Sequence, residues 1–234
     1  MNMFRGYEYV DYDVYFDWLI ILDACRYDFF IKNWKIGKTE PRASLDSCTL
    51  KVLDKMPPMK DAVVVTGHPF ILLRRNKFGK VLDAGFNHNL STTPPDYITR
   101  TVIKHFKTIR RFPKKILWFL QPHHPYIGET KLDVRIYKED NVTLTPQEET
   151  ERKLMEARKK GILLKAYEDN LKLVLKEIKK LLTLIKGKII ITSDHAEGLG
   201  LPLTKEDKPV YSHPCGRKEL EVRIIPFCVI NKYY

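Results

Sequence analysis

Aspartate and histidine residues follow three apolar stretches of the sequence. Asp23 comes directly after WLIIL, Asp194 and His195 come directly after KIIITS, and His123 and His124 come after ILWFLQP. If each stretch is a strand of one open α/β sheet, these side chains meet beyond the carboxyl ends of the strands, where such sheets bind ligands. Converging carboxylates and imidazoles are what a divalent metal ion requires. One aspartate after a strand is usually a helix N-cap, but the same pattern after three strands favours a metal site.

Short apolar runs alternate with helical patterns along the chain. Continuous apolar runs are typical of strands that helices cover on both faces. We therefore expect an α/β fold of three layers, with a mostly parallel central sheet between two layers of helices. The expected strands span residues 18–22, 62–66, 116–120, 188–192 and 222–230.

One long helix is expected over residues 146–185. Its second half carries apolar residues at intervals of three and four, from Leu164 to Ile185, and these form one apolar stripe. Gly187 follows as a C-cap and leads into the next strand. We interpret the polar segment 128–146 before this helix as an irregular loop.

The length and composition suit one ordinary domain. The chain has 234 residues, of which 44% are hydrophobic and 30% charged, and this balance excludes a disordered chain or a membrane-spanning one. We expect a single domain over residues 1–234, with residues 1–16 as an N-terminal extension. We find no signal peptide and no apolar run long enough to span a membrane.

The chain is basic, with 41 positive and 29 negative residues and therefore a net charge of +12. Residues 100–115 alone hold seven lysines and arginines and no acidic residue. We interpret such stretches as solvated helix faces, and the surplus favours an anionic substrate, either a small molecule or a polymer. A nucleic-acid surface is the alternative, and it is not favoured because no RNA- or DNA-binding motif is present.

Four cysteines, Cys25, Cys48, Cys215 and Cys228, are too few for a disulfide scaffold, and their spacing matches no zinc motif. We interpret them as reduced thiols, which indicates a cytoplasmic protein.

Several segments together resemble the alkaline phosphatase/sulfatase superfamily. Residues 23–28 (DACRYD) resemble its D-x-x-R-x-D opening, and residues 123–126 (HHPY) resemble its H-x-P-Y segment. Residues 192–200 (TSDHAEGLG) resemble T-S-D-H-G-E-x-x-G, with Ala196 in place of the usual glycine. Residues 212–214 (SHP), followed by VRIIPF, resemble its closing histidine and final strand. The chain is most similar to small archaeal sulfatase-like proteins of unassigned substrate.

The resemblance extends over residues 17–231 and implies an alkaline phosphatase-like sandwich that holds zinc or manganese, as one ion or two, at the strand ends. The metal ligands that it implies are Asp23, Thr49, Asp194, His195 and His213. Because both carboxylates follow central strands, we expect Asp23, Asp194 and His195 to converge within roughly 3–5 Å of one another.

The resemblance also implies a nucleophile at the start of a helix, and the segment 44–53 occupies that place. Thr49 best matches the threonine nucleophile of the phosphatase and phosphodiesterase branches, where a metal lowers the pKa of the hydroxyl. Alternatively, Ser47 or Thr49 only caps the helix. Cys48 is followed by TLKV and lacks the C-x-P-S-R motif of true sulfatases. We therefore predict that Cys48 is neither catalytic nor paired with Cys25.

The other histidines near the predicted strand ends are expected to have different roles. His123 and His213 each lie close to a proline, and we expect both to be catalytic, binding phosphoryl oxygens or a second metal ion within about 8 Å of the Thr49 hydroxyl. Alternatively, one of the two only braces its loop. His124 should point away, because neighbouring side chains alternate in an extended segment. His68, after VVVTG, could line the same cleft or satisfy a turn.

These residues predict a metal-dependent hydrolase or transferase that acts on phosphate mono- or diesters through Thr49. The alternative is a degenerate sulfatase-like domain that binds an anionic ligand or a partner without turnover.

Overall fold

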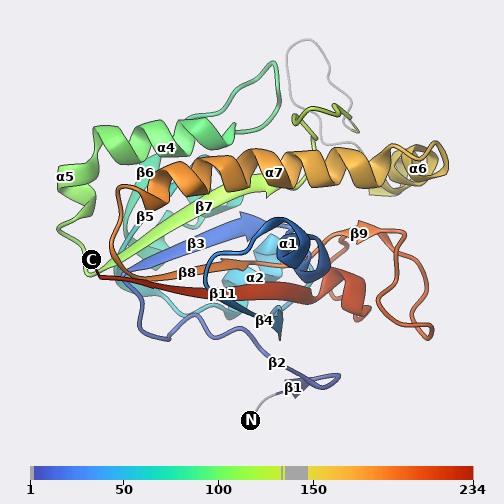
Figure 1. The fold of residues 1–234 in the computed structure, drawn as a ribbon, viewed down its shortest axis with the longest axis horizontal. Helices are drawn as coiled ribbons and strands as arrows, with labels where there is room; N and C mark the ends of the chain where they lie inside the picture. Colours follow the sequence, from blue (N-terminus) through green and yellow to red (C-terminus); the bar gives the residue numbers. More distant parts are fainter. Residues whose placement is uncertain (1–2, 133, 135–146, 234) are drawn as a thin grey trace.

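The computed structural model describes residues 3–132, 134 and 147–233. The main sheet contains β3 (Trp18–Asp23), β4 (Lys38–Ala43), β5 (Met59–Thr66), β6 (Phe78–Asp83), β7 (Lys114–Pro122), β8 (Gly187–Ser193) and β11 (Ile224–Lys232). These seven strands follow the order β4-β11-β8-β3-β7-β5-β6 (Figure 1). The pairs from β8 to β6 are parallel, and β11 runs antiparallel to both β4 and β8. The predicted α/β fold with a mostly parallel sheet is confirmed.

Helices cover both faces of this sheet. Successive residues of β3 alternate between the faces, as in any strand: Trp18 and Ile20 pack into one hydrophobic cluster, and Leu19 and Ile21 into the other. The first cluster lies beneath α1 (Tyr27–Asn33), α4 (Pro95–Lys104), α5 (Phe106–Ile109), α6 (Gln147–Lys159) and α7 (Leu163–Leu182). The second lies against α2 (Thr49–Lys55) and α3 (Pro69–Leu73). The predicted three layers are therefore present.

The single helix predicted over residues 146–185 is wrong, because the chain forms two helices there. The break between α6 and α7 contains Gly161, whose φ is +75°. That left-handed conformation cannot continue an α-helix and suits a residue without a side chain. The apolar stripe predicted for the second half is confirmed, since Tyr167, Leu171 and Val174 of α7 are all buried.

Two strands of the main sheet were not predicted, and one boundary differs. The edge strands β4 and β6 carry charged residues and lack the apolar run that marks a strand buried on both faces. The last strand begins at Ile224 and not at residue 222, because the short 3₁₀ helix η2 (Leu220–Val222) precedes it. Of the predicted loop 128–146, residues 133 and 135–146 lie outside the described residues.

The chain also forms short elements around the main sheet. The N-terminal residues contain the hairpin of β1 (Met3–Phe4) and β2 (Tyr7–Glu8), and then Val10, Tyr12 and Phe16 pack into the second hydrophobic cluster. A second two-stranded sheet pairs β9 (Gly198–Leu199) with β10 (Tyr211–Ser212). The 3₁₀ helix η1 (Arg75–Lys77) leads into β6.

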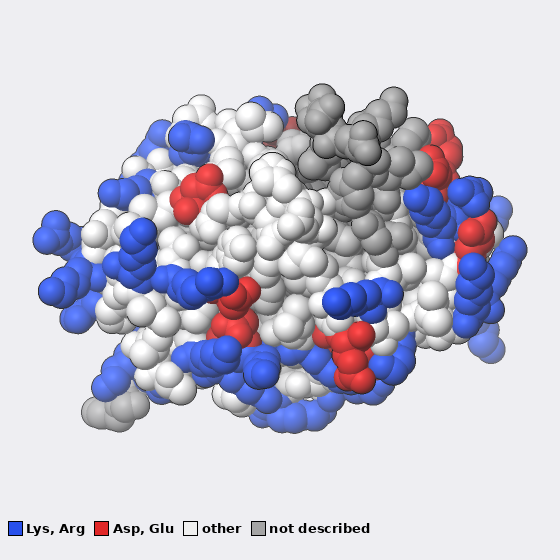
Figure 2. Space-filling view, turned by 90° about the horizontal axis from the view of Figure 1, so that it is seen from above, with Lys and Arg blue, Asp and Glu red and all other residues white. Residues whose placement is uncertain are grey.

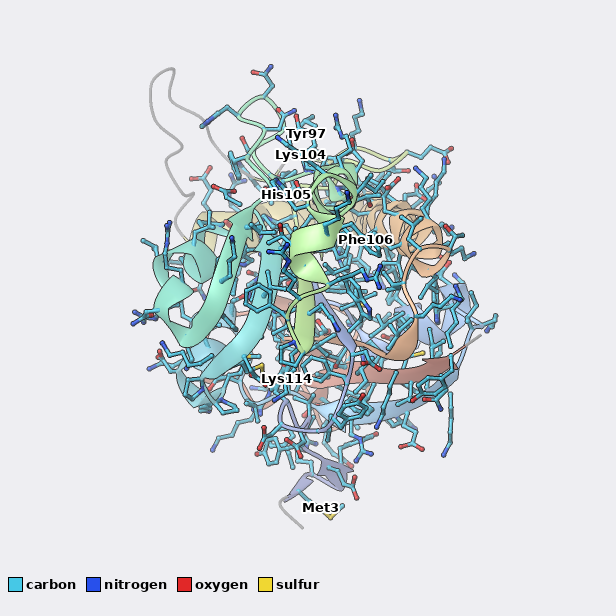
Figure 3. The ribbon with its side chains drawn as sticks, turned by 90° about the vertical axis from the view of Figure 1, so that its left-hand side faces the viewer. Met3, Tyr97, Lys104, His105, Phe106 and Lys114 are labelled. Atoms are coloured by element: carbon cyan, nitrogen blue, oxygen red, sulfur yellow. A yellow bond between two sulfur atoms is a disulfide. The ribbon has the colours of Figure 1, made fainter. Side chains whose placement is uncertain are left out.

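Lysine and arginine side chains lie in several groups over the helical face in Figure 2, with acidic side chains between them. Arg100 pairs with Asp96 on the surface of α4, for example, in keeping with a solvated face. The basic stretch 100–115 lies at the end of the molecule where the parallel strands begin, as Lys104 and Lys114 show (Figure 3). That end is opposite to the carboxyl ends of the strands. Among the described helices, none combines the length and the apolar character needed to cross a bilayer.

Candidate active site

Asp23 and Asp194 lie side by side because their strands are parallel neighbours. Leu22 of β3 pairs with Ser193 of β8, so the residues that follow reach the same edge of the sheet. Ligand atoms of Asp23, Asp194 and His195 all lie within 4.8 Å of one another. All three side chains are buried. The convergence predicted from the strand ends is therefore present.

The hydrogen bonds of His195 show what this cluster can bind. Its Nδ1 lies 3.0 Å from the carbonyl oxygen of Ala196. A carbonyl can only accept, so Nδ1 carries a proton, and Nε2 is the ring nitrogen that faces the carboxylates. That Nε2 lies 3.4 Å from Asp23 Oδ1 and 3.6 Å from Asp194 Oδ2. Two carboxylate oxygens and an imidazole nitrogen that face one another at these distances are a donor set that fits a divalent cation.

His68 orients the Asp23 carboxylate. The Nδ1 atom of His68 accepts a hydrogen bond from the backbone N–H of Phe70 at 3.2 Å, which leaves the proton of the neutral ring on Nε2. Nε2 donates to Asp23 Oδ2 at 3.2 Å. Asp23 Oδ1, which faces His195, has no hydrogen-bond partner within the described part of the chain. His68 therefore satisfies the turn, as one of the two alternatives predicted, and also contacts the candidate site through Asp23.

Thr49 lies beside the carboxylates. It is the first residue of α2, and its hydroxyl donates to Asp194 Oδ2 at 2.8 Å and lies 3.3 Å from His195 Nε2. The alternative role of Ser47 or Thr49 as a helix cap is wrong, because the N-cap residue is Cys48 and no side chain caps this helix. The other oxygen of Asp194 accepts from the backbone N–H groups of Ala24 and His195. Asp194 thus has one oxygen fixed by the backbone and one turned to the hydroxyl.

A second cluster lies next to the first. Its ligand atoms lie within 4.8 Å of one another and come from His123, His124, Glu197 and His213. The rings of His213 and His195 are 4.2 Å apart between centroids, so His213 connects the two clusters. The ring of His123 lies 4.9 Å from that of His213.

The prediction that His124 points away is wrong. Its ring lies 4.1 Å from that of His123 and belongs to the same cluster. The alternation rule does not apply, because β7 ends at Pro122 and the chain bends over residues 123–125. Glu197 was part of the recognised motif, but no role was assigned to it. Its place three residues after Asp194, in SDHAE, is the signal that could have found it.

Burial dominates the electrostatics of both clusters. It raises the pKa of Asp194 above its ordinary value, and the Asp23 carboxylate adds to the rise while His195 opposes it. Burial also raises the pKa of Glu197 well above its ordinary value, again with a contribution from Asp23. Burial and the neighbouring His195 lower the pKa of His213 well below its ordinary value, so this imidazole is neutral at pH 7. A cation bound here would stabilise the ionised form of these buried carboxyls.

The expectation of four reduced cysteines is wrong for two of them. Cys48 and Cys215 form a disulfide across a sequence separation of 167 residues. Only Cys25 and Cys228 are free, and both are buried. The prediction that Cys48 does not pair with Cys25 is confirmed. A cytoplasmic location was inferred from reduced thiols, and this pairing removes that reason for it.

No protein-family model and no curated protein sequence matches this chain. Solved structures do. The soluble domain of lipooligosaccharide phosphoethanolamine transferase A from Neisseria meningitidis matches with a TM-score of 0.55 and 11% identity, over 91% of this chain and 75% of that one. The C-terminal periplasmic domain of EcEptC from Escherichia coli, in complex with zinc, matches with a TM-score of 0.51 and 11% identity, over 99% and 77%.

A candidate sulfatase from Bacteroides thetaiotaomicron matches with a TM-score of 0.57 and 11% identity, over 97% of this chain and 65% of that one. This chain has the alkaline phosphatase-like sulfatase fold. At such low identity the likeness establishes the architecture, and the chemistry depends on the residues described above.

Proposed function

We propose that this protein is a metal-dependent enzyme that acts on phosphate mono- or diesters with Thr49 as its nucleophile, as a hydrolase or a transferase. The observation that carries the proposal is the position of the Thr49 hydroxyl, 2.8 Å from Asp194 Oδ2 and 3.3 Å from His195 Nε2. A hydroxyl at the edge of a buried group of metal-type ligands is suited to nucleophilic catalysis. The fold adds support, since one structural neighbour is a phosphoethanolamine transferase.

Asp23, Thr49, Asp194 and His195 would hold a divalent cation, zinc or manganese. The donor set of two carboxylates, an imidazole and a hydroxyl suits either metal, and a zinc complex is known for a neighbour with the same fold. When bound, the metal would lower the pKa of the hydroxyl and polarise a phosphoryl oxygen.

The residues of the chain define two steps. Thr49 Oγ1 attacks phosphorus, the bond from phosphorus to the ester oxygen breaks, and the departing alcohol takes up a proton. Asp194 Oδ2 already accepts the Thr49 proton in a hydrogen bond. Water, or the hydroxyl of an acceptor, then attacks the phospho-threonine and restores Thr49. Water gives a hydrolase and an acceptor hydroxyl gives a transferase.

His123 and His213 are proposed to bind the non-bridging phosphoryl oxygens or a second ion, with His213 as the ligand nearer to the first cluster. Their support is the second cluster, in which Glu197 and His124 lie beside them. Sulfate ester hydrolysis through formylglycine is not proposed, because Cys48 lacks the C-x-P-S-R motif and is bonded to Cys215.

The test is hydrolysis of nitrophenyl phosphate and bis-nitrophenyl phosphate with added Mn²⁺ or Zn²⁺. Thr49→Val keeps the shape and lacks the hydroxyl, and it should lower kcat by about a thousandfold or more. Thr49→Ser restores a hydroxyl and should recover a large part of the activity. Turnover that survives Thr49→Val would assign the nucleophile elsewhere. Tight metal binding without turnover of any ester would favour the alternative, a degenerate domain that only binds an anionic ligand.

A further inference from the structure

The disulfide joins two segments that carry proposed functional residues. Cys48 is the N-cap of α2 and directly precedes Thr49. Cys215 lies two residues after His213, in the loop that follows β10. The covalent link therefore connects the nucleophile segment with the histidine loop, although 167 residues separate them in sequence.

Hydrogen bonds reinforce this link on both sides. Ser47 Oγ donates to the carbonyl oxygen of Pro214 at 2.5 Å and accepts from the backbone N–H of Arg217 at 2.9 Å. The backbone N–H of Gly216 donates to Asp46 Oδ1 at 2.8 Å. We call the two segments, residues 46–48 and 214–217, the clasp.

The clasp closes a ring of contacts around the site. The His213 ring lies 4.2 Å from the His195 ring, and His195 Nε2 lies 3.3 Å from the Thr49 hydroxyl. From Thr49 the ring returns through Cys48 and the disulfide to Cys215 and the loop of His213. The position of His213 relative to Thr49 is thus set by the clasp on one side and by packing on His195 on the other.

We propose that the Cys48–Cys215 disulfide is a positioning element of the active site: it holds His213 over Thr49, and only the oxidised protein has the complete site. The catalytic consequence rests on the proposed function, whereas the effect on the position of His213 does not. A displacement of about 1 Å in a catalytic group can lower a rate about a hundredfold.

The disulfide is accessible to a reductant, because Cys215 is exposed. A dithiol such as dithiothreitol would transfer two electrons and two protons to the bond, giving two thiols and the cyclic disulfide of the reagent. The hydrogen bonds of Ser47 and Asp46 would remain in the reduced protein. We therefore expect reduction to loosen the His213 loop and to leave the sheet folded.

The disulfide could instead stabilise the fold without positioning His213. A double-mutant cycle distinguishes these two roles. The esterase kcat/KM is measured for the wild type, for C48S/C215S, for His213→Ala and for the triple variant, all with the same Mn²⁺ concentration. If the disulfide acts through His213, its removal lowers kcat/KM by about tenfold to a hundredfold in the wild type and by less than about twofold in the His213→Ala background. Cys228→Ser is the matched control, because it removes a buried free thiol and leaves the clasp intact. An equal loss in both backgrounds would overturn the proposal.

Two measurements decide the proposal even if no ester is turned over. Thiol titration of the unfolded, unreduced protein should find two thiols among the four cysteines, Cys25 and Cys228. The imidazole NMR signals of His213 should shift or broaden on reduction, while those of exposed His88 stay unchanged. Four titratable thiols, or a His213 signal that is unchanged by reduction, would refute the positioning role. Neither result would affect the assignment of Thr49 as the nucleophile.

Discussion

Two backbone groups determine which ring nitrogen of His68 and which of His195 faces the carboxylates of the candidate site. The N–H of Phe70 takes the Nδ1 lone pair of His68, so Nε2 of His68 donates to Asp23. The carbonyl of Ala196 accepts a hydrogen bond from Nδ1 of His195, so Nε2 of His195 faces the carboxylates. In the proposed metal site, His68 would orient a ligand and His195 would be one. Such outer hydrogen bonds typically tune metal affinity.

This arrangement gives a prediction for His68. His68→Ala removes the donor to Asp23 Oδ2 and leaves the carboxylates, His195 and Thr49 in place. We expect the affinity for Mn²⁺ or Zn²⁺, measured by calorimetry, to fall by about tenfold to a hundredfold. The control is His88→Ala, because His88 is exposed and lies in the segment before α4. If His68→Ala binds metal as tightly as the wild type, Asp23 is not oriented by this hydrogen bond.

At the scale of elements, the strand ends position the residues of the candidate site, and this part of the site is predictable from sequence. A continuous apolar run identifies a buried strand, and the polar residue after it must emerge at the edge. Asp23, Asp194 and His195 follow directly from that rule. This rule does not identify the edge strands β4 and β6. Each of them pairs with a single strand, and its sequence mixes charged and apolar residues.

Other features depend on contacts between loops, for which a single sequence carries no periodic signal. The direction of His124 is set by a bend over residues 123–125, and the partner of Cys48 is set by the way the loop of Cys215 returns to α2. The break at Gly161 was visible as a glycine, but the helix was predicted to run through it. Contacts between distant segments decided the pairing of Cys48, whereas a local change of backbone direction decided the other two cases.

The break between α6 and α7 can be tested at Gly161. A Cβ there would meet no atom within 4 Å, so its φ of +75° is the only reason for glycine. Gly161→Ala should destabilise the protein by about 1 kcal/mol, which corresponds to a fall in Tm of about 2–4 °C in a chain of this size. Lys160→Ala, at the exposed neighbouring position, should leave Tm nearly unchanged. Equal Tm values for the two variants would mean that the backbone at residue 161 is not left-handed.

For the whole molecule, the buried carboxyls should link stability to pH and to the proposed metal ion. Burial raises the pKa values of Asp194 and Glu197 above their ordinary values of 3.8 and 4.5. Above those ordinary values the folded, metal-free protein keeps protons that the unfolded chain has released. The free energy of unfolding must then fall as the pH rises, because stability decreases with pH wherever the native state binds more protons.

We therefore expect the Tm of the metal-free protein to fall as the pH rises from about 5 to about 8. The lowered pKa of His213 and the net charge of +12 act in the opposite direction, since the unfolded chain binds the His213 proton more readily below pH 6.5 and loss of positive charge at higher pH relieves surface repulsion. The two effects are separated by D194N/E197Q, which keeps the surface charge and removes both buried acids, and whose Tm should not show this fall. Saturating Mn²⁺ should abolish the fall in the wild type, because a bound cation stabilises the ionised carboxylates and binds more tightly as they lose their protons. The contrary outcome is that the Tm of the metal-free wild type follows the pH in the same way as the Tm of D194N/E197Q. That result would show that these carboxyls are not the groups that a metal ion neutralises. The cation would then have to bind at a different set of ligands.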